Sequence, residues 1–312
     1  MMLMESSLHL PIAEMMDKRP RPCFDCSSSF LLIVLAGMVM LGPSSRLLPP
    51  ALADQPPSNA NEFALDVLRH EEEEQTQDHT LWSYSEQKQE DGKKKLFHVY
   101  QTKQGEMERL ASVNGQPLTA EQAKAEEQRI QKLLANPGEI RKSQKKQHED
   151  GEQARKLLRM FPEAFLFQND GMQGALVRLK FAPNRKFHPS DHPGQVFHHM
   201  TGAMLLDPRQ KRLAAIDGTL TSEVKFFGGV FGHLDQGGTF QVELQEVHPH
   251  VWEVTAMHVH MKGKALFFKT IAVEEDETYF DFQPVSGDVT LAQAAELLKE
   301  KARDTSKAQA RN

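Results

Sequence analysis

The alternation of apolar and polar residues predicts a long series of antiparallel strands between residues 196 and 284. Apolar segments of strand length, rich in Val, Phe, Thr and Leu, are each closed by Gly, Pro, Asp or Asn, which is the pattern of strands joined by turns. None of these segments has the spacing of an amphipathic helix. The predicted strands cover residues 196–206, 212–221, 224–231, 238–247, 250–261, 265–273 and 278–284.

The residues before this series predict a helix followed by three strands. Asn61 is expected to cap a helix over residues 62–73, because an Asn side chain accepts hydrogen bonds from the free amide groups of a first helical turn. The glutamates at 71–74 are interpreted as the solvated end of that helix. Turn pairs such as Asp91-Gly92 separate the alternating segments that follow, as in β-hairpins. The three predicted strands cover residues 82–89, 95–103 and 107–113.

A charged helical hairpin is predicted over residues 119–161. Thr119 and Gln122 have the spacing of a capping box, and the Asn-Pro-Gly sequence at 136–138 separates the two arms. The apolar stripe of both arms is thin, so these helices are expected to lie across the fold rather than inside it. The second arm also carries a group of cations, interpreted as a solvated helix face, with contact to anionic lipid headgroups as the alternative: Arg141, Lys142, Lys145 and Lys146.

The predicted order of elements indicates an α+β fold. A strand at 174–181 precedes the long series, and Thr290 caps a last amphipathic helix at 291–301. Helices are therefore expected to cover a large curved antiparallel sheet, a half-barrel, with the charged helical hairpin as an insertion. We expect a single domain over residues 54–303 and a disordered tail at 304–312.

The N-terminal residues have the features of a cleaved export signal. Lys18, Arg19 and Arg21 precede an apolar run at 30–41, and Ala-Leu-Ala at 51–53 supplies a small-x-small cleavage site. The apolar run is shorter than the ~20 residues that span a bilayer, which favours cleavage over an uncleaved membrane anchor. Residues 1–53 are therefore predicted to be a signal peptide, and the mature protein is expected in the periplasm.

Cysteine usage narrows the chemistry of the mature protein. Cys23 and Cys26 both fall in the predicted leader, also if translation starts at Met15 or Met16. A mature chain without cysteine excludes a disulfide framework, a thiol nucleophile and cysteine-ligated metal.

Composition and charge describe a folded protein that does not bind nucleic acid. The chain is 39% hydrophobic and 26% charged, as expected for a folded soluble domain. The formal net charge of -6 argues against nucleic acid as a partner, because such proteins carry a basic surface.

Several blocks resemble the superfamily of periplasmic carriers that includes the lipoprotein carrier LolA, the lipid carrier LppX and the stress sensor RseB. The similarity rests on residues 82–84 after the first helix, on residues 202–207 turning into 212–216, and on the glycine-punctuated segment 218–238. The resemblance implies a half-barrel that holds a lipid or a lipoprotein. It assigns no functional residue, because it depends on the order of elements and on one strand-turn-strand block.

A half-barrel lined by apolar residues and covered by helices favours an acyl chain as ligand. Burial of each methylene contributes ~0.8 kcal/mol, so a partly enclosed chain binds usefully and still exchanges. Alternate strand residues share a face, and the same residues also suit an ordinary core. The candidate ligand-binding residues are Phe226, Val230, Phe240, Val242, Trp252, Val254, Leu266 and Phe268.

Histidines provide a competing interpretation. His258 and His260 are two residues apart and share one face of a strand, which suits two imidazole ligands of a metal ion. His188 and His192 form a second pair in a polar loop. No HExxH or comparable motif supplies a third ligand or a general base.

The sequence thus predicts a non-catalytic carrier without a cofactor. It has no G-x-S-x-G elbow and no glycine-rich phosphate loop, which argues against the common hydrolase and nucleotide-binding classes. The expected partners are a lipid or an acylated protein and a membrane-bound transfer partner. The alternatives are an envelope sensor or interaction domain on the same fold, and a metal-binding protein or metalloenzyme based on the histidines.

Overall fold

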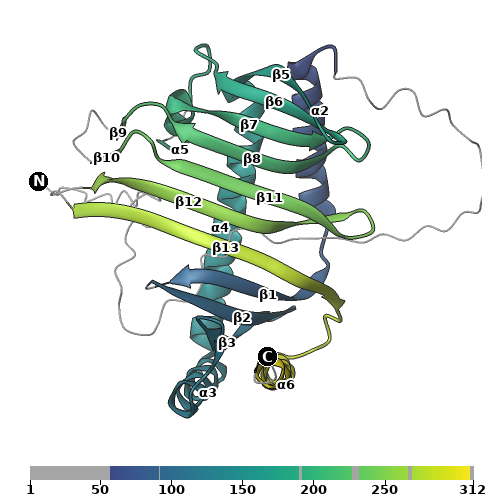
Figure 1. Cartoon of the computed structure of the whole chain (residues 1–312), viewed down its shortest axis with the longest axis vertical. Helices are drawn as coiled ribbons and strands as arrows, with labels where there is room; N and C mark the ends of the chain where they lie inside the picture. The colour runs from purple at the N-terminus through teal and green to yellow at the C-terminus, as the bar shows by residue number, and fades with distance from the viewer. Residues whose placement is uncertain (1–56, 91, 190–191, 227–231, 266–268, 310–312) are drawn as a thin grey trace, which may run out of the picture.

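The computed structural model describes residues 57–309 except residues 91, 190–191, 227–231 and 266–268. In this part of the chain, thirteen strands form one antiparallel sheet, accompanied by five α-helices and one short 3-10 helix (Figure 1). The predicted α+β class and the large antiparallel sheet are therefore confirmed. The predicted leader at 1–53 lies outside the described residues.

The last strand of the chain pairs with the first long one. β13 (Lys269–Val285) lies between β1 (Leu81–Glu90) and β12 (Val251–Ala265), so the N-terminal strands extend the sheet built by the C-terminal strands. As a result, β4 (Gln116–Pro117) and β5 (Phe165–Gln173) lie at opposite edges. The strand order is β4-β3-β2-β1-β13-β12-β11-β8-β7-β6-β5, and a short hairpin of β9 and β10 pairs with β12. The other strands are β2 (Lys93–Thr102), β3 (Gly105–Val113), β6 (Leu176–Pro183), β7 (Met200–Asp207), β8 (Arg212–Leu220), β9 (Val224–Phe226), β10 (Gly232–Leu234) and β11 (Thr239–His248).

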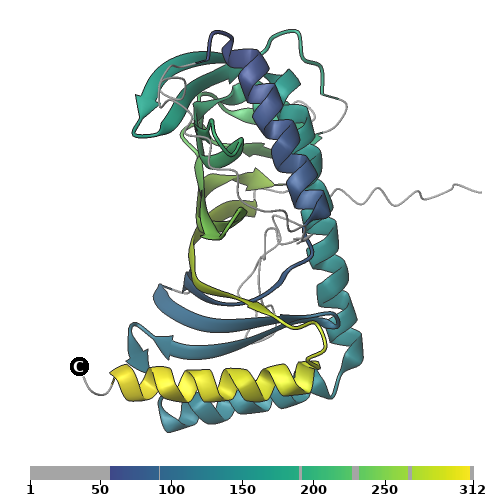
Figure 2. The ribbon, with the colours of Figure 1, turned by 90° about the vertical axis from the view of Figure 1, so that its right-hand side faces the viewer.

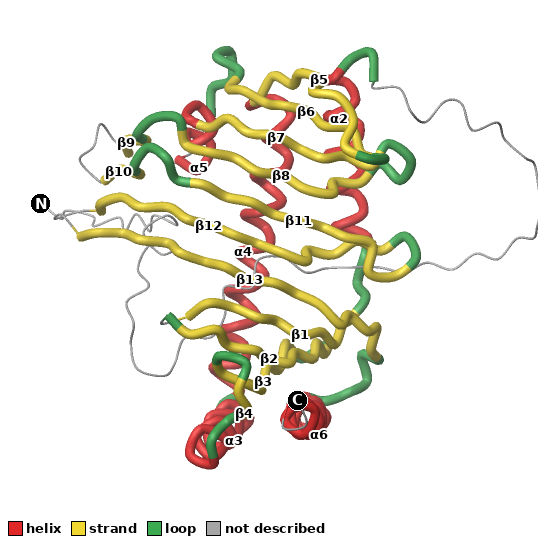
Figure 3. Tube along the Cα trace, in the orientation of Figure 1, coloured by secondary structure: helices red, strands yellow, loops and turns green. Residues whose placement is uncertain are grey.

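Two helices cover one face of the sheet, which we call the inner face. α4 (Pro137–Ala164) runs behind the strands from the end that holds β3 to the end that holds β5 (Figures 1 and 3). α2 (Ala60–Gln77) packs beside α4 and against β5 and β8 (Figure 2). Their apolar residues close the largest core of the protein, which includes Val67, Leu68, Phe161, Phe165, Leu179, Phe181, Phe197, Met204 and Leu206.

On the opposite, outer face, α6 (Leu291–Gln309) covers the sheet near β2 and β3. Tyr100 and Met107 are directly paired there and pack against α6. The neighbouring Val99 points to the inner face, where it packs with Trp82 and Tyr84. α3 (Ala120–Leu134) contributes Ile130 to the core under α6, which also contains Leu291, Ala294, Ala295 and Leu298.

The structure does not confirm the predicted helical hairpin at 119–161. The break falls where it was predicted, because α3 ends at Leu134 and α4 begins at Pro137. The two helices diverge, however: α3 lies beside α6, whereas α4 crosses the sheet (Figure 2). The chain has to connect strands at opposite edges, and the 28 residues of α4 rise about 42 Å, which a hairpin would not.

Helix ends follow the predicted capping chemistry in two of three cases. The Thr119 hydroxyl accepts from the Gln122 amide and the Gln122 side chain accepts from the Thr119 amide; Thr290 pairs with Gln293 in the same way. The predicted cap at Asn61 is wrong. α2 begins earlier, at the cap residue Asn59. The Asn61 side chain instead accepts from the amide of Phe167 at 2.9 Å and so ties α2 to β5.

Several predicted boundaries also change. The first strand predicted in the long series, 196–206, begins later than expected. Residue 196 ends α5 (His192–Val196), the 3-10 helix η1 (Phe197–His199) follows, and only then does β7 begin. Residues 269–273 and 278–284, predicted as parts of two strands, belong to the single strand β13, because the acidic residues between them pair with β12 instead of turning. Residue 265 instead ends β12, and residues 266–268 lie outside the described residues. The predicted disordered tail at 304–312 is wrong at its start, since α6 continues to Gln309 and the Thr305 hydroxyl bonds to the Lys301 carbonyl.

Three strands were not predicted from the sequence: the short strands β4 and β10, and the longer β5. β5 contains Asn169, Asp170 and Gly171, which are typical of a turn. In the structure they form an irregularity in the pairing of β5 with β6, between Asn169 and Met172. The strand continues on both sides of it.

A buried ion pair fixes α2 to the sheet. Arg212 at the start of β8 approaches Glu71 of α2 with two nitrogen–oxygen distances of 2.9 and 3.0 Å. The amide of Leu213 donates to the same carboxylate at 3.2 Å. The Arg212 and Glu71 side chains are 6% and 1% exposed, so the interpretation of residues 71–74 as solvated is wrong for Glu71.

In the described residues, no helix is both long and apolar enough to span a bilayer.

We expect Arg212→Met to lower the free energy of unfolding by about 3–5 kcal/mol, because it leaves the Glu71 carboxylate buried without its cation. The adjacent Lys211 is a matched control, since its 2.8 Å pair with Asp66 is exposed. Lys211→Met should cost less than about 1 kcal/mol. Urea unfolding followed by circular dichroism measures both variants. Equal losses would show that burial of the Arg212 pair does not determine its contribution.

Candidate functional site

Part of the inner face is apolar but incompletely covered. Six residues on β8, β11 and β12 are only partly buried and pack against the main core. The direct pairing of Val242 with both Ile216 and Met257 shows that these strands present one common face. We call this set the apolar band: Ile216, Phe240, Val242, Trp252, Val254 and Met261.

The structure places four of the eight predicted ligand-binding residues in the apolar band: Phe240, Val242, Trp252 and Val254. Phe226 is 5% exposed and belongs to the closed core instead. Val230, Leu266 and Phe268 lie outside the described residues.

Trp252 is held at the end of the band that lies nearest to α2. Its indole nitrogen donates to the Gln210 side chain at 3.1 Å. The Arg212 guanidinium lies 6.0 Å from the centre of the indole ring. The residue that fixes α2 therefore also contacts the band.

A cluster of charged residues and tyrosines lies beside the band on the inner face. Glu86 of β1 is directly opposite Tyr279 of β13, and Lys88 is directly opposite Glu277. Glu277 is in turn opposite Met257, whose other partner is Val242 of the band. We call this set the acidic cluster: Tyr84, Glu86, Lys88, Glu106, Glu108, Glu277 and Tyr279.

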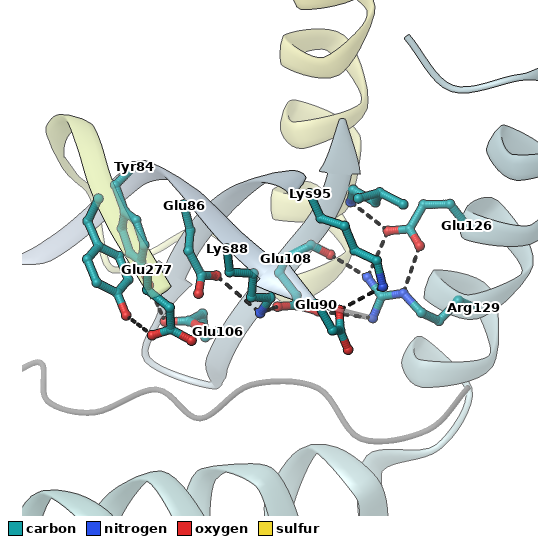
Figure 4. Close-up of polar contacts among 12 residues, drawn as sticks. Tyr84, Glu86, Lys88, Glu90, Lys95, Glu106, Glu108, Glu126, Arg129 and Glu277 are labelled. Atoms are coloured by element: carbon teal, nitrogen blue, oxygen red, sulfur yellow. Dashed lines mark hydrogen bonds and ion pairs between the residues drawn. The ribbon is translucent and has the colours of Figure 1, made fainter. Parts of the chain in front are cut away.

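Hydrogen bonds link the members of the acidic cluster (Figure 4). The Tyr84 hydroxyl donates to Glu106 at 3.1 Å, and the Tyr279 hydroxyl donates to Glu277. The Lys88 ammonium lies 3.4 Å from the Glu86 carboxylate and 4.0 Å from that of Glu108. A single lysine thus lies between carboxylates from two strands.

Arg129 of α3 closes the cluster on the side of β3. Its guanidinium donates to the Glu108 carbonyl at 2.8 Å and lies 3.6 Å from the Glu108 carboxylate. Both carboxylate oxygens of Glu126 also accept from Arg129, and Glu126 accepts from the Leu110 amide at 2.9 Å. These contacts hold α3 against the edge of the sheet (Figure 4).

Burial changes the protonation of this cluster. It raises the pKa of Glu86 to about 8; Lys88 opposes that rise, and Glu277 and Glu108 add to it. Burial, with the nearby Glu108, also raises the pKa of Glu106. Glu86 therefore keeps its proton at neutral pH and can donate a hydrogen bond. Together with Lys88 and the tyrosines, it offers both donors and acceptors to a polar group.

A second buried acid lies near the end of α2. Burial, with the Asp78 charge, raises the pKa of Glu253 to about 8. Burial likewise raises the pKa of Asp78, the residue after α2, to about 6. Carboxyl groups with raised pKa values thus lie at both sides of the apolar band.

The outer face holds a buried serine and histidine in contact. The Ser85 hydroxyl lies 3.0 Å from Nδ1 of His98, and Nε2 of His98 lies 2.9 Å from the Thr305 hydroxyl of α6. Burial lowers the pKa of His98 to about 4, so the ring is neutral at pH 7. Ser85 is 0% exposed, so this chain of hydrogen bonds joins α6 to the sheet away from solvent.

The predicted histidine ligands are not assembled into a metal site. His258 and His260 lie on the outer face, and both rings bond to one oxygen of Asp276, at 2.7 and 2.9 Å. His188 is exposed in the segment after β6, and the side chain of His192 lies outside the described residues. Among the residues that the structure describes, no group of three or more His, Cys, Asp or Glu side chains is arranged to hold a metal ion.

Sequence reasoning missed the acidic cluster, although a signal for it exists. Tyr84, Glu86 and Lys88 alternate along β1, and Glu106 and Glu108 alternate along β3, so each set shares a face. Charged residues at alternate positions usually mark a solvated face. Here the covering elements bury them.

Comparison of the chain with protein-family models, with curated protein sequences and with solved structures finds no match.

The charge state of Glu86 gives a pH-dependent prediction. Its pKa rises from 4.5 to about 8 on folding, so its contribution to stability is full below pH 4.5 and is lost as pH rises through 8. Glu86→Gln has no proton to lose. It should therefore nearly match the wild type near pH 4.5 and exceed it by up to about 5 kcal/mol at about pH 9.

Urea unfolding across this pH range measures the difference. Glu90→Gln is the control, because Glu90 lies on the same strand and is more exposed, in a 2.7 Å pair with Lys95. It should show no gain at high pH. Parallel pH profiles for the wild type and Glu86→Gln would show that Glu86 ionises normally in the folded protein.

Proposed function

We propose that the chain is an exported, non-catalytic carrier that binds an acylated ligand, a lipid or a lipoprotein, on the inner face of its sheet. The observation that carries this proposal is the apolar band, which is partly exposed although it lies on the face covered by α2 and α4. The sequence resemblance to the LolA-like carriers and the predicted signal peptide at 1–53 also support it.

The band has suitable chemistry for an acyl chain. Its side chains are aliphatic or aromatic, so they bind methylene groups through the hydrophobic effect. A segment of about ten methylenes gains about 8 kcal/mol, which corresponds to a dissociation constant of about 1 μM. Such a ligand is retained in water and still exchanges.

The acidic cluster is suited to the polar end of the same ligand. It is separated from the band only by Met257, through the direct pairs Glu277 with Met257 and Met257 with Val242. Protonated Glu86 and Lys88 donate hydrogen bonds that ester or amide carbonyls accept. An amphipathic ligand would therefore lie across β11, β12 and β13, with its chain on the band and its linkage at the cluster.

Release of the ligand requires a second state of the protein. A membrane or partner favours release only if it binds the open form better than the closed form.

The first test is mass spectrometry of an organic extract. The chain is expressed with its leader and purified from the periplasm without detergent. Near-stoichiometric lipid or fatty acid is expected. A clean extract, together with no binding of added fatty acid, would mean that the inner face is closed by its own side chains and would end the carrier proposal.

The variant Val242→Trp tests whether the ligand binds on the apolar band. The larger apolar side chain fills the band and should lower bound lipid at least about tenfold, since overfilling a site excludes its ligand. Gln245→Trp is the matched control, because Gln245 is exposed on the same strand, and it should retain lipid. Circular dichroism confirms folding of both variants. Full lipid content in Val242→Trp would move the ligand away from the band.

A further inference from the structure

The outward side of α4 carries four cations within two helical turns, which we call the basic patch: Arg141, Lys142, Lys145 and Lys146. All four are exposed. The other side of this segment faces the sheet, where Gln144 packs against Gly105 in the turn between β2 and β3. No carboxylate occurs in the sequence from residue 140 to residue 148.

Neighbouring carboxylates neutralise little of the positive charge of the basic patch. Lys145 lies 3.4 Å from Glu149 in an exposed pair. No described carboxylate lies within ion-pair distance of the other three cations. Some exposed lysines on the sheet are paired, for example Lys180 with Asp170 and Lys262 with Glu274. A concentrated positive surface thus occurs on a chain whose net charge is -6.

Helix stability does not account for the position of these cations. The helix dipole favours cations in the last turn of a helix, and the last turn of α4 has none. The patch instead occupies the first half of α4, where cations gain nothing from the dipole. A role in binding is therefore the better explanation.

We propose that the basic patch is a docking surface for anionic lipid headgroups, through which α4 lies against a membrane. Clusters of four or more Lys and Arg residues on one helix are the usual means of peripheral attachment to acidic lipids. The residues between the cations, Ser143 and Gln144, are polar, so no apolar side chain of this segment inserts into the bilayer. Docking is thus electrostatic, salt-sensitive and reversible. It uses the outward side of α4, so it is distinct from the acyl site on the inner face.

The test uses co-sedimentation with vesicles of phosphatidylcholine, with or without about one third phosphatidylglycerol. The protein should bind the anionic vesicles at low salt and dissociate at about 0.5 M salt, where the Debye length falls to a few ångströms. Each basic residue near the surface contributes roughly fivefold, so replacing all four by Gln should weaken binding by about 10²–10³-fold.

A second variant tests whether vesicle binding depends on the basic patch itself or only on the net charge of the protein. Lys124, Lys180, Lys225 and Lys262 are exposed on other elements, and their joint replacement by Gln changes the net charge equally. This control should keep anionic binding. Equal loss in both variants, absence of vesicle binding by the wild type, or patch-dependent binding to DNA but not to vesicles would each overturn the proposal.

The result is also distinguishable from a failure of the carrier proposal. The patch variant should still yield lipid on organic extraction, because its substitutions lie away from the band. Loss of extracted lipid with intact vesicle binding would count against the carrier proposal and leave docking in place.

Discussion

The pairing of β1 with β13 determines the arrangement of the rest of the protein. It joins the N-terminal strands to the far end of the C-terminal meander, which leaves β4 and β5 at opposite edges of an eleven-strand path. With strands about 4.8 Å apart, the chain between them has to cross about 48 Å. α4 rises about 42 Å along its 28 residues, and curvature of the sheet accommodates the difference. The long helix on the inner face is thus a consequence of strand order.

Because of this arrangement, the inner face changes from apolar to polar along the sheet. Where α2 packs beside α4, two helices close a fully apolar core against β5 to β8. α2 is held there by the Arg212–Glu71 pair and ends before it reaches β1 (Figure 2). Beyond its end the inner face changes first to the partly exposed band and then to the acidic cluster. The proposed ligand site therefore lies where helical cover changes from two helices to one.

The sequence predicted features that depend on neighbouring residues. The capping boxes at Thr119 and Thr290 and the break before Pro137 follow from local backbone chemistry, and all three are found. The pairing of β1 with β13 could not be predicted, because it joins residues almost 200 positions apart and no local pattern encodes it. The same reason explains why the predicted helical hairpin is not confirmed. The acidic cluster was missed because Glu86 and Glu108 are polar residues that only distant elements bury.

The acidic cluster is not explained by folding alone. A buried ion pair is often no more stable than apolar residues of the same size, and a carboxyl group forced to stay protonated opposes folding at neutral pH. Glu86, Glu106 and Glu253 all have raised pKa values for this reason. A sheet selected only for stability would carry apolar residues at these inward positions. Departures from that rule are expected where a protein binds a ligand. Here they lie beside the apolar band, whose residues are only partly buried.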